Sequence, residues 1–439
     1  MNKYKAVPII TCLAVAALAL GLFLGISFKS KRNGDIADAD RSHAGAAETV
    51  EETAAHTDSL NVTGNHITAD SEGNGQNSEA ADASAGQNET LGESVVQNNP
   101  DTNGADQEPG ISEPVTETVH ADGDFVSTDS SFYTYEEMMA DLDEMASAYP
   151  ALLSVRTCGT SLDNRAIPEA VLGNPGSEKH IFIQASIHAR EYINTLVAMR
   201  QIEQMLVHHT DGVYVDASYD DLLSQVCFHI LPMSNPDGVT ISQMGIEGIR
   251  DEDLKSILRT CYQNDLDNGR TSSDTDSYYR TWKANARGVD LNRNFDAGWD
   301  TYEGVSYPSS DHYKGPSPVS EPETQAIVNA VHACQAILTI SYHSTGSVIY
   351  WDYGSTGEVY ENDAALANFA HVLTGYSTVS SVQSSQDAAG CSDYFVLRES
   401  VPSITIENGY SPCPIGIEEF PSIWNSNQTL LPALAYNYR

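Results

Sequence analysis

One junction in the chain joins an apolar, strand-like run to a helical period and carries polar residues where the two meet. The run covers residues 181–183, the helical period covers 193–207, and Ala185-Ser186-Ile187-His188-Ala189-Arg190-Glu191-Tyr192 lies between them. An imidazole and a carboxylate three residues apart, His188 and Glu191, can turn toward one point here. The pair is either half of a metal site or a solvated helix N-terminus at which Glu191 is favoured by the helix dipole.

Strand-like runs and helical periods follow one another through residues 131–439, enough chain for one large core. This predicts an α/β domain. Strands are expected at 152–158, 167–172, 181–185, 225–232, 337–341, 347–351 and 403–409, and helices at 133–149, 193–207, 320–336, 362–373 and 416–438. Ser320 and Glu323 indicate a capping box. Residues 239–279 are polar and irregular and indicate an insertion, and 377–390 a Ser-rich loop.

The N-terminal part has a different composition. Residues 6–28 are uncharged and almost wholly apolar, which is long enough to span a bilayer, so 1–32 are expected to be a signal peptide or a membrane anchor. Residues 33–130 are rich in Asp, Glu, Ala, Ser, Thr, Gly and Asn and cannot bury enough apolar surface to fold, which predicts a disordered acidic spacer. We therefore expect the rest to be extracellular, either secreted or tethered to the outer face of the cytoplasmic membrane.

Net charge limits the binding partners that this protein can have, and the cysteine content limits its possible disulfide bonds. The formal net charge of −39 argues against nucleic acid and anionic membrane surfaces as partners, so membrane contact is expected only through the N-terminal segment. We expect a monomer. Of the seven cysteines, Cys12 lies in the apolar segment, and the other six permit disulfides in an exported chain. Cys391 and Cys413, which flank the last strand, are the first candidate pair.

Three later segments add polar residues. Residues 280–295, RTWKANARGVDLNRNF, concentrate basic side chains in an acidic chain and suit either anion binding or a solvated basic loop. His343 follows one strand, and open α/β sheets gather their sites at the carboxyl ends of strands. It would complete a His2Glu ligand set with an open position for water. Glu407, costly to bury at a strand end without purpose, is a candidate general base.

The order HxxE, NPDG, GVDLNRNF, strand-end His and strand-end Glu resembles the zinc carboxypeptidase family of carboxypeptidases A, B and T, over about residues 131–439. The resemblance implies a single domain with a mixed, mostly parallel central sheet flanked by helices. It also implies one zinc ion, peptide substrates and these site residues: His188, Glu191 and His343 as zinc ligands, Glu407 as general base and acid, Arg190 near the scissile carbonyl, and Asn292 with Arg293 receiving the substrate's terminal carboxylate.

The sequence also departs from the pattern of the digestive members. Lys283 stands where they have a second arginine, with Arg280 three residues earlier, and residues 384–387 lack their mobile-loop tyrosine. Ser392 matches the floor of their specificity pocket, and a small neutral residue there argues against selectivity for arginine or lysine, although its neighbour Asp393 keeps that selectivity open. WKANARGVDLNRNF and GCSDYF are more similar to the bacterial branch that includes γ-D-glutamyl-diaminopimelate peptidases.

These features predict an exported zinc metallocarboxypeptidase that cleaves next to a free carboxylate. Glu407 would take a proton from metal-activated water, and Arg190 with Lys283 or Arg280 would stabilise the oxyanion. An alternative substrate is a cell-wall stem peptide. A zinc-dependent amidase on small molecules has no need for the carboxylate clamp, and an inactive binding module would be expected to have lost a ligand or the base.

Overall fold

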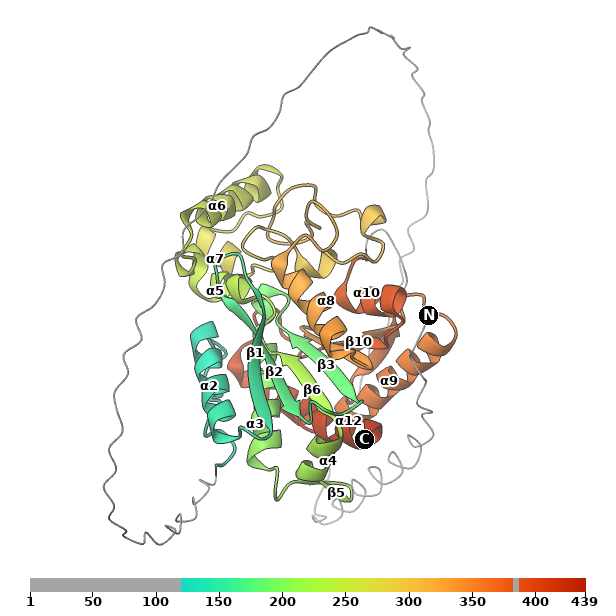
Figure 1. Ribbon diagram of the computed structural model, residues 1–439. Coiled ribbons are helices and arrows are strands. Elements are labelled where there is room, and N and C mark those ends of the chain that lie inside the picture. The colour runs from blue at the N-terminus through green and yellow to red at the C-terminus, as the bar shows by residue number, and fades with distance from the viewer. Residues whose placement is uncertain (1–119, 382–386) are drawn as a thin grey trace, which may run out of the picture. The chain divides into compact units, whose positions relative to one another are not determined.

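The computed structural model describes residues 120–381 and 387–439. Its main sheet has eight strands in the order β1-β2-β6-β3-β7-β10-β8-β9 (Figure 1). The central strands β6, β3, β7 and β10 are parallel neighbours, whereas β1 with β2, β2 with β6, and β10 with β8 pair antiparallel. The expected α/β domain with a mixed, mostly parallel sheet is confirmed. The strands are β1 (Leu153–Thr160), β2 (Ala166–Gly173), β3 (His180–Ala185), β6 (Cys227–Leu231), β7 (Leu338–His343), β8 (Val348–Trp351), β9 (Ser377–Ser380) and β10 (Ser403–Glu407).

Helices cover both faces of this sheet because alternate side chains of each central strand point to opposite sides. On β3, Ile181 and Ile183 belong to one apolar cluster and Phe182 to another. The first cluster includes residues of α2 (Tyr135–Ala148), α3 (Ile193–Val207), α4 (Tyr219–Gln225), α9 (Glu358–Thr374), α11 (Phe420–Asn427) and α12 (Leu430–Tyr438). The second includes residues of α8 (Pro322–Cys334) and α10 (Cys391–Tyr394), which lie in front of the sheet in Figure 1. A small hairpin of β4 (Val213–Tyr214) and β5 (Ala217–Ser218) precedes α4.

The segment predicted to be an irregular insertion is mostly helical, so that prediction was wrong. It forms α5 (Pro236–Met244), α6 (Glu252–Asp267) and α7 (Thr275–Arg280). Leu258, Tyr279 and Trp282 are buried in a separate apolar cluster there. The side chains of Asp251 and Asp274 accept backbone N–H groups at the starts of α6 and α7. A helical period is present in α6, at Leu254, Ile257, Leu258 and Cys261, and it was overlooked because the other face of that helix is strongly polar.

Three local predictions also need correction. The capping box at Ser320 is absent, since α8 begins after Glu321 without a side-chain cap, and Glu323 instead turns inward, where Asn285 donates to it. The predicted loop at 377–390 begins with the edge strand β9. The final predicted helix is two helices, α11 and α12.

No disulfide joins the cysteines within the described residues, so pairing Cys391 with Cys413 was wrong. Cys391 is buried at the start of α10. The Cys413 thiol instead faces the Ser344 carbonyl at 3.6 Å. The two thiols therefore lie in different environments and do not bond to each other.

Residues 120–130, assigned from the sequence to the spacer, pack against the domain. Phe125 and Val126 are buried, and the Phe125 N–H donates to Glu203 Oε1 at 2.9 Å. The folded unit therefore extends upstream of residue 131. The expected signal peptide or anchor and the spacer up to residue 119 lie outside the described residues. Within the described part, no helix has the length and apolar character needed to cross a bilayer.

Candidate metal centre

The loop between β3 and α3 positions the first two candidate ligands. β3 ends at Ala185, and a short 3-10 turn, Ala189–Glu191, leads into α3. His188 and Glu191 are both buried, and His188 Nδ1 lies 2.9 Å from Glu191 Oε1. The predicted strand-to-helix junction is confirmed, and its imidazole and carboxylate turn toward each other instead of toward solvent.

His343, the last residue of β7, joins this pair from the neighbouring strand. Its Nδ1 lies 3.0 Å from His188 Nδ1 and 3.0 Å from Glu191 Oε2. Two ligands about 2.0–2.1 Å from a zinc ion at a tetrahedral angle stand about 3.3 Å apart, so the three groups are spaced nearly as a zinc shell requires. Two ring nitrogens and one carboxylate, all buried, fit a catalytic zinc ion with one open position.

The carboxylate of this group is kept anionic. Burial by itself would raise the pKa of Glu191, but the adjacent His188 and His343 hold that pKa well below its usual range. The Ser344 N–H also donates to Glu191 Oε2 at 3.1 Å. Glu191 is therefore oriented as an ionised ligand.

Asp290 is a functional candidate to which the sequence analysis gave no role. It is fully buried, and its Oδ1 lies 3.3 Å from His188 Nε2, the ring nitrogen that faces away from the ligand cluster. Burial would raise the pKa of Asp290, but Lys283 and His188 hold that pKa well below its usual range. A carboxylate behind a ligating histidine fixes the tautomer and the ring orientation. The available signal was an acid inside GVDLNRNF, a stretch otherwise apolar, polar or basic.

Glu407 ends β10 and lies directly opposite His343 in the parallel register. Burial raises the pKa of Glu407 to about 7, with Glu191 adding to the rise and His343 opposing it. A carboxyl group with a pKa near neutrality is suited to accepting and returning a proton.

The three basic residues expected near the scissile carbonyl have different positions. Lys283 adjoins the metal loop, because its carbonyl accepts the Ala189 N–H at 3.1 Å, and its ammonium counteracts the rise in the pKa of Glu407. Arg190, within the 3-10 turn, donates from Nη1 to the Thr281 carbonyl at 3.2 Å. Arg280 is exposed at the end of α7. Lys283 and Arg190 thus carry the positive charge beside the candidate ligands.

Asn292 and Arg293 lie on the loop after Asp290. Asn292 Oδ1 accepts the Cys391 N–H at 2.8 Å. The Arg293 guanidinium lies over the Tyr302 ring, 5.3 Å from its centroid, and its Nη2 donates to Asp387 Oδ1 at 3.1 Å. The Arg293 side chain is only 14% exposed, whereas Asp387 is 60% exposed. A carboxylate from a substrate can take the place of this exposed partner.

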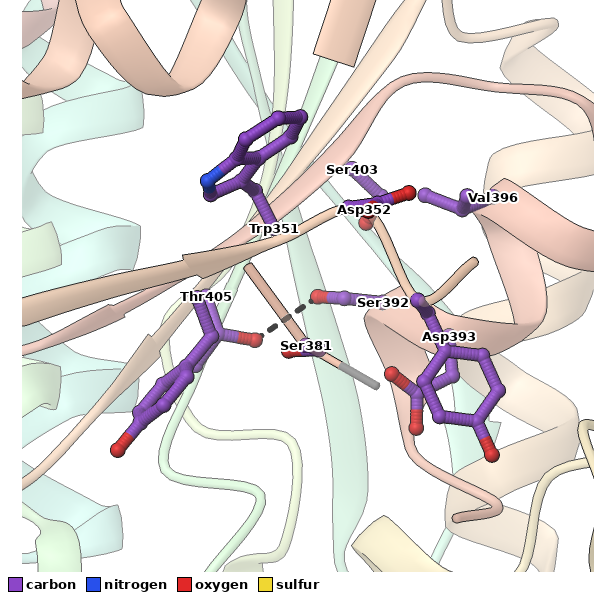
Figure 2. A pocket seen from close by; sticks show the side chains of 10 residues that line it. Trp351, Asp352, Ser381, Ser392, Asp393, Val396, Ser403 and Thr405 are labelled. Carbon is purple, nitrogen blue, oxygen red and sulfur yellow. Dashed lines mark hydrogen bonds between the residues drawn. The ribbon is translucent and has the colours of Figure 1, made fainter. Parts of the chain in front are cut away.

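Ser392 and Asp393 line a small pocket with Thr405 (Figure 2). Thr405 lies two residues before Glu407 on β10, so the two side chains share one face of the sheet. The side-chain oxygens of Ser392 and Thr405 are 2.9 Å apart, as the dashed line in Figure 2 shows. The Gly390 N–H donates to Asp393 at 3.0 Å. Burial, together with the nearby Asp387, raises the pKa of Asp393 to about 7. The pocket thus offers hydroxyl and carboxyl groups on the side of the base.

A buried His/Glu/His group beside a carboxyl base at the end of an α/β sheet defines a metal-dependent hydrolase. The family model for zinc carboxypeptidases matches residues 138–409, and the chain belongs to the zinc carboxypeptidase family. It is therefore a zinc metallopeptidase with a metal cofactor, and the interpretation as a binding module is set aside.

Two curated relatives illustrate the range of the family. The chain is 30% identical over 295 residues to γ-D-glutamyl-L-diamino acid endopeptidase 1 of Lysinibacillus sphaericus, covering 66% of this chain and 69% of that protein. It is 29% identical over 276 residues to carboxypeptidase B of Astacus astacus, covering 60% and 81% respectively.

Two solved structures share the fold. Carboxypeptidase A from Helicoverpa armigera has a TM-score of 0.51 at 21% identity and covers 69% of this chain and 73% of its own. Thrombin activatable fibrinolysis inhibitor has a TM-score of 0.53 at 19% identity and covers 74% and 77%.

Proposed function

We propose that His188, Glu191 and His343 bind the catalytic zinc ion of a metallocarboxypeptidase that hydrolyses a peptide bond next to a free carboxylate. The observation that carries this proposal is the convergence of the three groups, with both contacts of His343 Nδ1 at 3.0 Å. When bound, zinc supplies a Lewis acid and lowers the pKa of water toward neutrality.

The protein's own groups then handle the proton and the charges. Glu407, half-buried at the end of β10, takes a proton from the attacking water and returns it to the leaving amine. Lys283 and Arg190 supply positive charge to the carbonyl oxygen as it becomes an oxyanion. Asn292 and Arg293 hold the terminal carboxylate of the substrate, which decides which peptide bond lies at the metal.

A second candidate substrate is a γ-D-glutamyl-diamino acid bond of a cell-wall peptide. The endopeptidase of Lysinibacillus sphaericus, whose name states that chemistry, is 30% identical to this chain. In this protein, Asp387 pairs with Arg293, and Asp393 lines a pocket together with Thr405, which lies two residues before Glu407 on β10. A released diamino acid has a carboxylate that Arg293 can bind and a side-chain amine that Asp387 and Asp393 can bind. A C-terminal lysine has the same two groups, so the site suits both.

We also propose that residues 131–439, with the packed segment 120–130, form the catalytic domain of an exported monomer. The apolar segment 6–28 supports export, as a cleaved signal peptide or as an anchor to the outer face of the cytoplasmic membrane. The acidic spacer would separate the domain from that membrane.

The test compares substrates on the full-length protein. Turnover is measured with peptides ending in lysine or leucine, with amidated versions of the same peptides, and with a γ-D-glutamyl-diaminopimelate peptide, each with and without a chelator. We expect chelation to abolish activity and amidation to reduce it, and the preferred substrate separates the two candidates. Zinc-free protein whose activity is indifferent to the chelator would refute the metal assignment.

A further inference from the structure

A second group of potential metal ligands lies at the amino-terminal end of the central strands. His180 begins β3, and Cys227 and His229 lie on the adjacent strand β6. One ligand atom from each of the three residues lies within 4.8 Å of the others. β3 rises about 3.3 Å per residue, so its length separates this group from the catalytic loop that follows its other end. The proposed peptidase chemistry uses none of the three.

The strand register explains how the group forms. His180 is paired with Cys227 across the parallel β3–β6 ladder. Cys227 and His229 are two residues apart on β6, so their side chains share one face of the sheet. His180 is half-buried and the other two are buried. The sheet therefore holds a thiol and two imidazoles together without a loop.

The imidazole of His229 is oriented as a ligand. Its Nδ1 lies 2.6 Å from Glu169 Oε1, and Arg156 donates to both oxygens of that carboxylate at 2.7 and 2.8 Å. An ionised carboxylate only accepts hydrogen bonds, so Nδ1 carries the proton and Nε2 presents its lone pair. That Nε2 is 2.9 Å from His180 Nδ1. A carboxylate that orients a histidine in this way is the usual support of a metal-bound imidazole.

Solvent reaches the group through a cleft of about 540 Å³ lined by His180, His229 and Cys334, among others. Such a cleft supplies both an entry path for an ion and water for a remaining coordination position. A simple hydrogen bond from His180 to His229 would account for the 2.9 Å distance, but it does not require the buried Cys227 thiol beside it.

We propose that His180, Cys227 and His229 form a second metal site, selective for a borderline-soft divalent ion such as Zn²⁺. Two imidazoles and a thiolate are the donors that this class of ion prefers. Binding replaces the S–H bond of Cys227 by a metal–sulfur bond and releases the proton to solvent. The ion would tie β3 to β6 at the end of the sheet remote from catalysis.

The test uses the full-length protein, freed of metal and reloaded with Co²⁺. We expect two ions per chain, one for each ligand group, and a thiolate-to-cobalt charge-transfer absorption. That absorption reports the second site alone, because the catalytic group contains no thiol. Cys227→Ala should lose the absorption and one of the two ions while keeping its peptidase turnover. His180→Asn, at a half-buried position, should also lose one ion and guards against misfolding of the cysteine variant.

Cys158→Ala is the matched thiol control, since Cys158 lies on β1 with its thiol directed to the Ile167 carbonyl at 3.3 Å. It should retain both ions and the absorption. One ion per chain without the absorption, or an absorption that survives Cys227→Ala, would overturn the proposal and leave His180 and His229 as a hydrogen-bonded pair.

Discussion

His343 and Glu407 are the last residues of adjacent parallel strands and lie opposite each other in the β7–β10 register. The candidate metal ligand and the candidate base are therefore positioned by the backbone hydrogen bonds of the sheet. β3, which leads to His188 and Glu191, pairs with the other edge of β7. Because the core of the sheet is rigid, the base and the ligands are held in place before a substrate binds.

Replacing the base tests this arrangement most directly. Glu407→Gln keeps the shape of the side chain but cannot accept a proton, so we expect kcat to fall by roughly 10²–10⁴-fold. The variant should still bind zinc, because Glu407 is not among the three ligands. Turnover and metal content measured on the same preparation check both statements, and wild-type turnover would show that another group is the base.

The pH dependence follows from the same residue. Burial raises the pKa of Glu407 to about 7, and the base works only when it is ionised. Activity should therefore fall as the pH drops through the pKa of Glu407, and the charge of bound zinc should move the midpoint below the metal-free value. We expect kcat/KM to rise with pH and to level off at or below about pH 7. A profile that is flat from about pH 5 to 8 would contradict this role.

Asp290 should affect the metal more than the chemistry. Asp290→Asn removes the negative charge 3.3 Å from His188 Nε2, and loss of such a support costs roughly 10–100-fold in metal affinity. Competition with a chelator of known affinity measures the change. Asp296→Asn is a suitable control, because Asp296 lies in the same segment but pairs with the exposed Arg398. Equal losses in the two variants would refute a specific role for Asp290.

Arg293 and Asp387 should have opposite effects on substrate binding. Arg293→Ala removes charge-assisted bonds worth about 1.5–3 kcal/mol, so KM for a free C-terminal carboxylate should rise roughly 10- to 100-fold. Asp387→Asn frees the guanidinium from a largely exposed partner, and because such pairs contribute at most about 1 kcal/mol, KM for a peptide ending in leucine, which has no side-chain amine for Asp387 to bind, should fall by no more than about five-fold. Amidated peptides should be little affected by either change. A rise in KM for the leucine peptide in Asp387→Asn would contradict the competition between Asp387 and the substrate carboxylate.

A pair of matched substitutions distinguishes Lys283 from Arg280 as the residue that stabilises the oxyanion. Lys283→Met removes the ammonium that acts on Glu407, and loss of one group that stabilises an oxyanion costs roughly 10²–10³-fold in kcat. Lys283→Arg should retain most of the activity. Arg280→Met, at an exposed position, should change kcat much less, and the reverse order would transfer the role to Arg280.

The catalytic part of the fold could be predicted because its elements have strong local patterns. The apolar runs of β3 and β7 and the helical period of α3 appear directly in the sequence, and polar residues mark their ends. The helices of the segment 239–279 were missed because the segment as a whole is polar, although the apolar positions of α6 follow a helical period. The disulfide between Cys391 and Cys413 was mispredicted because two cysteines that flank one strand in the sequence need not have thiols that point toward each other.

The sequence by itself determined the residue types of the centre and the strand ends that carry them, since periodicity and motif order are local properties of the chain. Only the tertiary structure decided that the charge of Lys283 acts on Glu407 while Arg280 is exposed, that Asp290 lies beside His188, and that His180, Cys227 and His229 come together at the other end of the sheet. Each of these relationships depends on strand register or on loops that bring distant segments into contact, and side-chain direction across such contacts is set by packing.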